Sequence, residues 1–167
     1  MRILTLILFF VYIAFSCVKK PTTSPIPNIE FKDFKYTTKP TRPYPSDVGY
    51  IVIGYEDGDG DIFRNNDHAL ANLIIISYHK DSISGNFYQD STRPAPTEPK
   101  IAISYATTVY QPGAGYKGKS VKGEIIIPYD QFRLNRAIKV IKHVIYVVDE
   151  AGNKSNVITS PIYTLTI

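Results

Sequence analysis

Apolar residues recur along this chain in short runs with the spacing and composition of β-strands. The longer runs are rich in β-branched and aromatic residues and are bounded by Gly, Pro, Asn and Asp, which form turns. No apolar period of 3.6 residues persists beyond one or two turns, so we expect no helix long enough to form a layer. The longer runs cover residues 48–55, 73–78, 100–105, 123–128, 140–148 and 157–167.

A shorter run, 29–34, alternates apolar and polar residues next to prolines, which is typical of an edge strand. Together the runs give about seven strands, the number expected of an immunoglobulin-like or fibronectin-III-like antiparallel β-sandwich. Isoleucine fills positions 74–76 and 125–127, so alternation does not indicate which of these side chains face inward. We predict one immunoglobulin-like β-sandwich domain over residues 28–167.

The first residues have a different pattern. Arg2 precedes an apolar run that continues to Phe15, and the sequence Ala-Phe-Ser-Cys at 14–17 resembles a lipobox, in which small residues precede an acylated cysteine. The run is shorter than the about 20 apolar residues that cross a membrane. The bulky Phe15 departs from the lipobox pattern, and an ordinary secretory signal is the alternative. We predict a lipoprotein signal peptide over 1–16 and lipidation, for example by palmitate, at Cys17.

Cys17 is the only cysteine in the chain, so no internal disulfide can form and a cysteine-based metal or catalytic site is not expected. The residues that follow are rich in Lys, Pro, Thr and Ser, a composition that favours extended and poorly packed chain. We interpret residues 17–27 as an acylated tether that holds the sandwich away from a membrane.

The formal net charge of +4 is spread along the chain. No block of five or six basic residues occurs, and this absence argues against nucleic acid as a partner.

Three aspartates at alternate positions, Asp57, Asp59 and Asp61, are separated by glycines that let the backbone curl. Such carboxylates can converge on a hard cation such as Ca²⁺. The spacing does not match an EF-hand loop. Two interpretations stay open: a looser calcium site that also uses Asn65 or Asp67, and a solvated Asp/Gly-rich turn without an ion.

The candidates for a base at neutral pH are His68, His79 and His143, and none lies in a recognisable nucleophile motif. His143 falls within a predicted strand, where a hydrogen-bonded sheet histidine is expected. Aspartates two residues apart on one loop seldom flank a substrate from both sides, as glycoside hydrolysis requires. We therefore do not expect an enzyme.

The chain has 13 tyrosines and no tryptophan. Tyrosine is suited to contacts with sugars or partner proteins, and Tyr105, Tyr110 and Tyr116 lie in or near the long predicted loop 106–118. A ligand-binding role for these three is one interpretation. The favoured alternative is that most tyrosines cover the core of a small sandwich and its rims.

The segment 147–156 reads V-V-D-E-A-G-N-K-S-N, a turn in which Gly152 or Asn153 can adopt positive φ and Asp and Ser can bond to backbone. It resembles the terminal hairpin of many bacterial extracellular immunoglobulin-like domains. The matching residues are Asp149, Ala151, Gly152, Asn153, Ser155 and Asn156.

With the D-G-D-G-D-I segment at 57–62 and the N-terminal signal, the whole chain resembles small lipoproteins of Bacteroidota that carry one immunoglobulin-like domain. The resemblance implies a location in the cell envelope and a fold, and it implies no reaction. Surface-exported members tend to carry acidic residues after the acylated cysteine, whereas Val18-Lys19-Lys20 follow Cys17. We therefore expect the periplasmic face of the outer membrane in preference to the cell surface.

The sequence thus predicts a noncatalytic, membrane-anchored lipoprotein that presents an immunoglobulin-like interaction or structural module. The alternative is a carbohydrate-binding accessory lipoprotein of a glycan-uptake system. The expected partners are the membrane, through the lipid anchor, and an envelope protein or a glycan.

Overall fold

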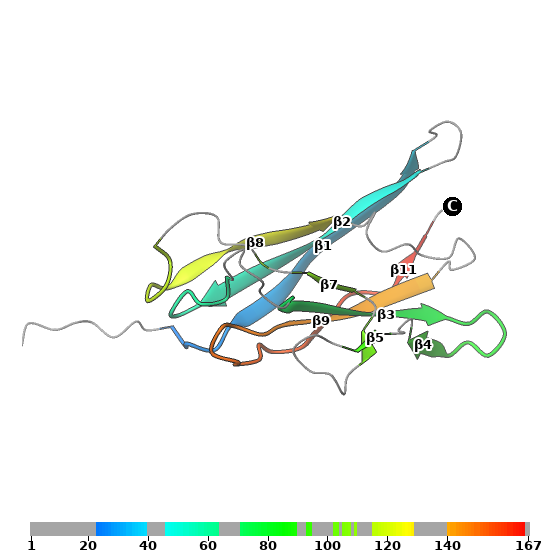
Figure 1. Cartoon of the computed structure of the whole chain (residues 1–167). Helices are drawn as coiled ribbons and strands as arrows, with labels where there is room; N and C mark the ends of the chain where they lie inside the picture. The colour runs from blue at the N-terminus through cyan, green and yellow to red at the C-terminus, as the bar shows by residue number, and fades with distance from the viewer. Residues whose placement is uncertain are drawn as a thin grey trace, which may run out of the picture.

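The computed structural model describes residues 23–39, 46–63, 71–89, 93–94, 102–103, 105–107, 109, 115–128 and 140–165. The predicted signal peptide, Cys17, Asn65, Asp67 and Tyr110 lie outside these ranges. Within them the chain forms strands and turns and no helix, so no described segment is a helix that could cross a membrane. The strands, shown in Figure 1, are β1 (Asn28–Lys39), β2 (Ser46–Asp57), β3 (Leu73–Lys80), β4 (Phe87–Gln89), β5 (Arg93–Pro94), β6 (Ala102–Ile103), β7 (Tyr105–Thr107), β8 (Val121–Pro128), β9 (Val140–Val147), β10 (Ile158–Thr159) and β11 (Tyr163–Thr164).

Two antiparallel sheets form the body of the molecule. One has the order β1-β2-β8. In the other, β9 and β3 pair at the centre, β10 and β11 pair with β9, and β4 and β7 pair with β3. The hairpin β1-β2 thus pairs with β8 in one sheet, and β9, which also pairs with β10 and β11, pairs with β3 in the other. This is the Greek-key arrangement of an immunoglobulin-like sandwich. The predicted all-β sandwich is confirmed, and β5 and β6 form a separate pair.

The core lies between the two sheets and takes side chains from both. Ile51 and Ile53 of β2 are fully buried together with Ile75 of β3 and Ile145 of β9. Burial of each such side chain contributes about 1.5–3 kcal/mol to folding. This shared core fixes the face-to-face packing of the sheets.

The isoleucine runs, whose orientation the sequence left open, behave differently in the two sheets. In β3, Ile75 faces the main core, while Ile74 and Ile76 are buried with Tyr146 in a second, smaller cluster. Strand β3 is therefore covered on both faces, and a continuous apolar run is expected of such a strand. In β8, by contrast, Ile126 is 63% exposed.

Strand β1 is longer than the predicted 29–34 and contains a β-bulge. Ile29 and Phe31 face the core, the register shifts between Phe31 and Asp33, and Phe34 and Tyr36 then face the core. A bulge adds one residue and changes the parity of the alternation. The apolar spacing 29, 31, 34 is therefore that of a bulged strand.

The predicted final strand, 157–167, is divided into β10 and β11. Between them Ser160 N donates to His143 O, and His143 N donates to Ser160 Oγ at 2.9 Å, so a side chain replaces a backbone acceptor. Pro161 follows and has no N–H to continue the ladder. The run at 100–105 is likewise divided between β6 and β7, whereas the short strands β4 and β5 were not predicted.

Candidate metal centre

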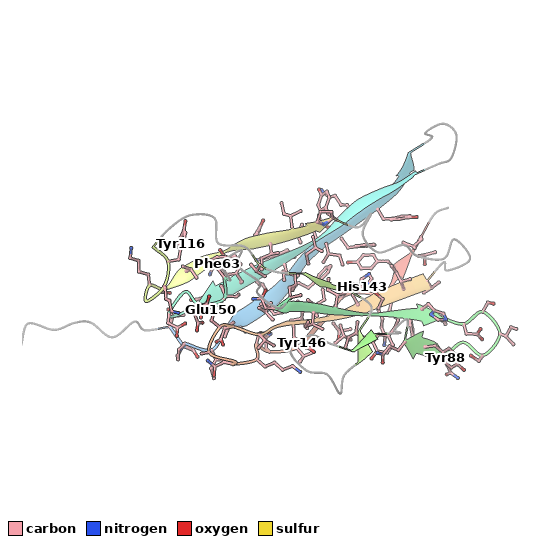
Figure 2. All side chains as sticks on the ribbon, viewed as in Figure 1. Phe63, Tyr88, Tyr116, His143, Tyr146 and Glu150 are labelled. Carbon is pink, nitrogen blue, oxygen red and sulfur yellow. The ribbon has the colours of Figure 1, made fainter. Side chains whose placement is uncertain are left out.

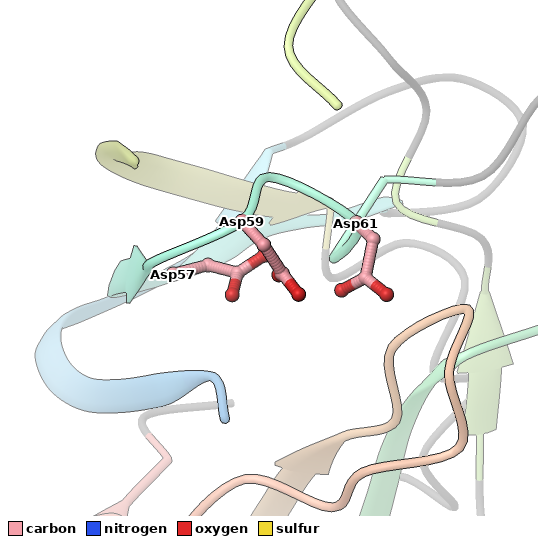
Figure 3. A group of neighbouring side chains, drawn as sticks. All are labelled: Asp57, Asp59 and Asp61. Carbon is pink, nitrogen blue, oxygen red and sulfur yellow. The ribbon is translucent and has the colours of Figure 1, made fainter. Parts of the chain in front are cut away.

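The three aspartates singled out in the sequence converge at one end of the sandwich. Asp57 is the last residue of β2, and Asp59 and Asp61 lie in the loop that follows. One oxygen of each carboxylate lies within 4.8 Å of the others, and Figure 3 shows the three side chains on the same side of the loop. The structure thus brings together three of the five predicted ligands.

Glycines allow this loop, called here the acidic loop (residues 57–63), to touch neighbouring backbone. Gly58 N donates to Ser24 O at 2.9 Å, and a Cβ at position 58 would overlap that oxygen. Gly60 has φ 70° and a Cβ there would overlap the carbonyl oxygen of Tyr116. Because positive φ and close approach both exclude a side chain, the alternating glycines are required by packing as well as by curvature.

Each carboxylate has one oxygen with no hydrogen-bond donor among the described residues. Asp57 Oδ2 accepts from Ile62 N at 2.9 Å, and Asp61 Oδ2 accepts from Ala151 N at 3.2 Å. The Oδ1 atoms of Asp57, Asp59 and Asp61 are buried and accept no bond. Asp57 is 0% exposed and Asp61 is 7% exposed. A buried carboxylate oxygen without a donor is costly, so this arrangement needs a charge or a proton to balance it.

Burial and mutual repulsion both disfavour ionisation of the cluster. Burial, together with the charges of Asp149 and Asp59, raises the pKa of Asp61 to about 7. Burial also raises the pKa of Asp57, against the opposing hydrogen bond from Ile62 N. The nearby Lys117 ammonium is exposed and pairs with Glu150 at 2.9 Å, so its charge lies at the rim of the site.

The hairpin that follows β9 is the second motif singled out in the sequence, and its predicted turn chemistry is confirmed. Asp149 Oδ1 accepts from Asn153 N at 2.7 Å, and Asp149 Oδ2 accepts from Asn153 Nδ2 at 2.9 Å. Gly152 has φ 88°. Asn156 then clamps the first strand, since its Oδ1 accepts from Ile29 N and its Nδ2 donates to Ile29 O.

The two motifs meet in space, which the sequence analysis did not anticipate. Glu150 N donates to Asp61 O at 3.0 Å, and Ala151 N donates to the Asp61 carboxylate. A topological signal for this meeting exists: in an immunoglobulin-like sandwich the second strand and the penultimate strand end at the same end of the molecule. Here these are β2 and β9, and their loops carry the two motifs.

The tyrosines proposed as ligand contacts do not form one described surface. Tyr116 is half-buried, and its ring packs against Phe63 with the ring centroids 5.6 Å apart (Figure 2). Tyr105 lies in β7, where its backbone is paired with Ile75. Tyr116 therefore has the role expected of a tyrosine that covers the core.

His143 lies in the middle of the second sheet (Figure 2). It is fully buried, its Nδ1 lies 3.0 Å from Ser77 Oγ, and its ring packs beside Phe34. Burial lowers the pKa of His143 to about 4, so the imidazole is neutral at pH 7. The expectation of a hydrogen-bonded sheet histidine is confirmed.

Comparison of the chain with protein-family models, with curated proteins and with solved structures finds no significant match.

Proposed function

We propose that this protein is a noncatalytic lipoprotein of the bacterial cell envelope, anchored through Cys17, that presents its β-sandwich as an interaction or structural module. The support in the sequence is the apolar run that ends on the only cysteine. This sequence feature carries the proposal, and the structure adds where an anchor on Cys17 would join the domain.

The chain is attached to the sandwich from its first described residues. Gly58 N donates to Ser24 O, and Ser120 Oγ donates to Thr23 Oγ1 at 3.2 Å. The tether that remains between Cys17 and Thr23 can span about 20 Å when fully extended. An anchor on Cys17 would therefore keep the acidic-loop end of the sandwich close to the lipid surface.

The opposite end would then face away from the membrane. It carries the turn between β3 and β4, where Ile83 is 94% exposed (Figure 1). Asp81 Oδ1 accepts from Ile83 N and from Ser84 N at 3.1 and 2.6 Å, which holds the turn in one shape. A turn held in a fixed shape at this end is suited to present a contact to an envelope partner.

The anchor is tested by mass spectrometry of the mature N-terminus and by fractionation of cells. We expect an acylated Cys17 and a membrane-bound protein, and we expect Cys17→Ser to move the protein to the soluble fraction. An unmodified Cys17, or cleavage at another residue, would contradict the proposal. Protease treatment of intact cells then distinguishes the periplasmic face from the cell surface.

The orientation is tested by a photo-cross-linking residue placed at position 83, at the far end, and at position 117, in the exposed turn at the acidic-loop end. We expect lipid adducts only from position 117 and protein adducts from position 83. Lipid adducts from position 83 alone would reverse the orientation.

A further inference from the structure

Three buried carboxylate oxygens face one another in the acidic loop, and none of them has a hydrogen-bond donor among the described residues. They are the Oδ1 atoms of Asp57, Asp59 and Asp61. The described donors close by, Ile62 N and Ala151 N, are used by the other oxygens of Asp57 and Asp61. In folded proteins, buried charges are paired or coordinate metals. The arrangement is therefore incomplete without a cation or a proton.

We propose that the acidic loop binds one divalent hard cation of the Ca²⁺ class through Asp57, Asp59 and Asp61. The oxygens are close enough for this: two ligands on opposite sides of a calcium ion, each at 2.3–2.6 Å, are about 5 Å apart. The three oxygens all lie within 4.8 Å of one another, so one calcium ion could contact all of them.

The donor set agrees with a hard cation. All three groups are carboxylates, and no cysteine or histidine of the described residues belongs to the cluster. Carboxylate oxygens suit Ca²⁺ and Mg²⁺ and suit soft metals less well. Calcium takes six to eight oxygen ligands, which three carboxylates with water or backbone carbonyls can supply.

The alternative of a solvated turn without an ion requires exposed carboxylates. Asp57 is fully buried at the end of β2, and Asp61 is buried between the loop and the hairpin at 149–153. Solvent therefore cannot surround all three carboxylates, as a solvated turn requires. Burial without donors thus favours the cation over the solvated turn.

The cation would stabilise more than its own loop, because the acidic loop contacts three other segments. Its backbone is bonded to Ser24 near the start of the domain, to Gly118 in the turn before β8, and to Glu150 in the final hairpin. Neutralising the carboxylates would tighten all of these contacts together. We therefore expect calcium to raise the resistance of this end of the sandwich to unfolding.

The first experiment uses the purified full chain in detergent, stripped with EDTA and titrated with CaCl₂ and separately with MgCl₂. We expect one calcium ion per chain by isothermal titration calorimetry. At a concentration about 100 times the Kd, we expect a rise in Tm of about 5–10 °C. Tb³⁺, excited through tyrosine in this tryptophan-free chain, should show enhanced emission that excess calcium removes.

The second experiment compares Asp59→Asn with Asp81→Asn. Asp59→Asn removes one proposed ligand and should weaken calcium binding at least about tenfold and abolish the rise in Tm at the same calcium concentration. Asp81→Asn alters the exposed turn after β3 and should keep both. Circular dichroism in EDTA verifies that both variants are folded, and Asp61→Asn replaces Asp59→Asn if the latter is not.

Two results would overturn the inference. One is a wild-type protein in which neither the Tm nor Tb³⁺ emission responds to calcium. The other is an equal calcium response in wild type, Asp59→Asn and Asp61→Asn. These measurements are made in detergent solution and do not depend on acylation, so their failure is distinct from a failure of the proposed lipid anchor.

Discussion

Two acidic turns lie side by side at one end of the sandwich, and they differ in how many hydrogen bonds their buried carboxylates accept. In the hairpin after β9, both oxygens of Asp149 accept hydrogen bonds from Asn153. In the acidic loop, one oxygen of each aspartate has no donor among the described residues. The first turn satisfies its charge with its own atoms, whereas the second has too few donors among the described residues and is the site of the proposed cation.

The cause is the spacing of donors and acceptors along the chain. Asp149 is four residues before Asn153, so the turn returns both a backbone and a side-chain N–H to it. In the acidic loop, aspartates alternate with glycines that offer no side-chain donor, and Gly58 N is directed to Ser24 O. The alternating pattern therefore brings three carboxylates close together, while the loop itself supplies Ile62 N as a donor to Asp57 alone among the described hydrogen bonds.

The largest expected effect on the free energy of unfolding comes from adding a methyl group to a glycine in each turn. Gly60→Ala in the acidic loop should lower the free energy of unfolding by about 3 kcal/mol or more, because the methyl group meets Tyr116 O at positive φ. Gly152→Ala in the hairpin also sits at positive φ but in open space, and should cost about 1–2 kcal/mol. Urea denaturation measures both. Equal losses would show that the acidic loop is not tightly packed.

A second prediction concerns the hairpin carboxylate. Asp149→Asn keeps the shape of the side chain but removes its charge. In one of the two orientations of the new amide, its NH₂ group faces Asn153 Nδ2, which is also a donor. We expect the free energy of unfolding to fall by about 2 kcal/mol, since hydrogen bonds to charged groups are stronger than neutral ones. Urea denaturation in EDTA provides the measurement. An unchanged stability would mean that the hairpin does not rely on the Asp149 charge.

A third prediction concerns His143, a buried group that is uncharged at neutral pH. His143 has a pKa of about 4 in the folded protein, below its ordinary value, so the unfolded chain binds a proton first as pH falls. The neutral histidine's contribution to stability is therefore present above about pH 6.5 and lost progressively towards pH 4. Between pH 7 and pH 5 the loss should be about 2 kcal/mol.

His143→Gln isolates this contribution, because glutamine cannot titrate and can still bond to Ser77. The difference in unfolding free energy between wild type and His143→Gln should change by the same amount over that pH range. Denaturant titrations at pH 5, 6 and 7 in EDTA provide the measurement. If the difference in unfolding free energy between wild type and His143→Gln does not change with pH, His143 has the same pKa in the folded and unfolded chain.

The smallest expected effect has the opposite sign to the hairpin result. In EDTA, Asp59→Asn should raise the free energy of unfolding by about 1 kcal/mol, because it removes one of the charges that repel Asp57 and Asp61. Differential scanning calorimetry in EDTA is sensitive enough to measure it. If Asp59→Asn instead lowers the free energy of unfolding as much as Asp149→Asn does, the carboxylates of both turns would stabilise the fold, and the two turns would not differ.

Much of the sandwich could be predicted from local pattern. The strands at β2, β3, β8 and β9 follow from runs of β-branched residues bounded by turn formers, and the turn bonds of Asp149 follow from residues four apart. The extension of β1 to Lys39 could not be predicted, because its polar end pairs with β2 through backbone bonds that any residue can make. The short strands β4 and β5 carry too few apolar residues to be recognised.

The candidate site divides in the same way. The residue types and the alternating spacing of Asp57, Asp59 and Asp61 are local, and they were sufficient to predict carboxylates able to converge on a cation. Whether those carboxylates would be solvated or buried depended on residues distant in the chain, such as Ser24, Tyr116 and Ala151. Backbone periodicity is a property of neighbouring residues, whereas burial and the supply of hydrogen-bond donors arise only when distant segments pack together.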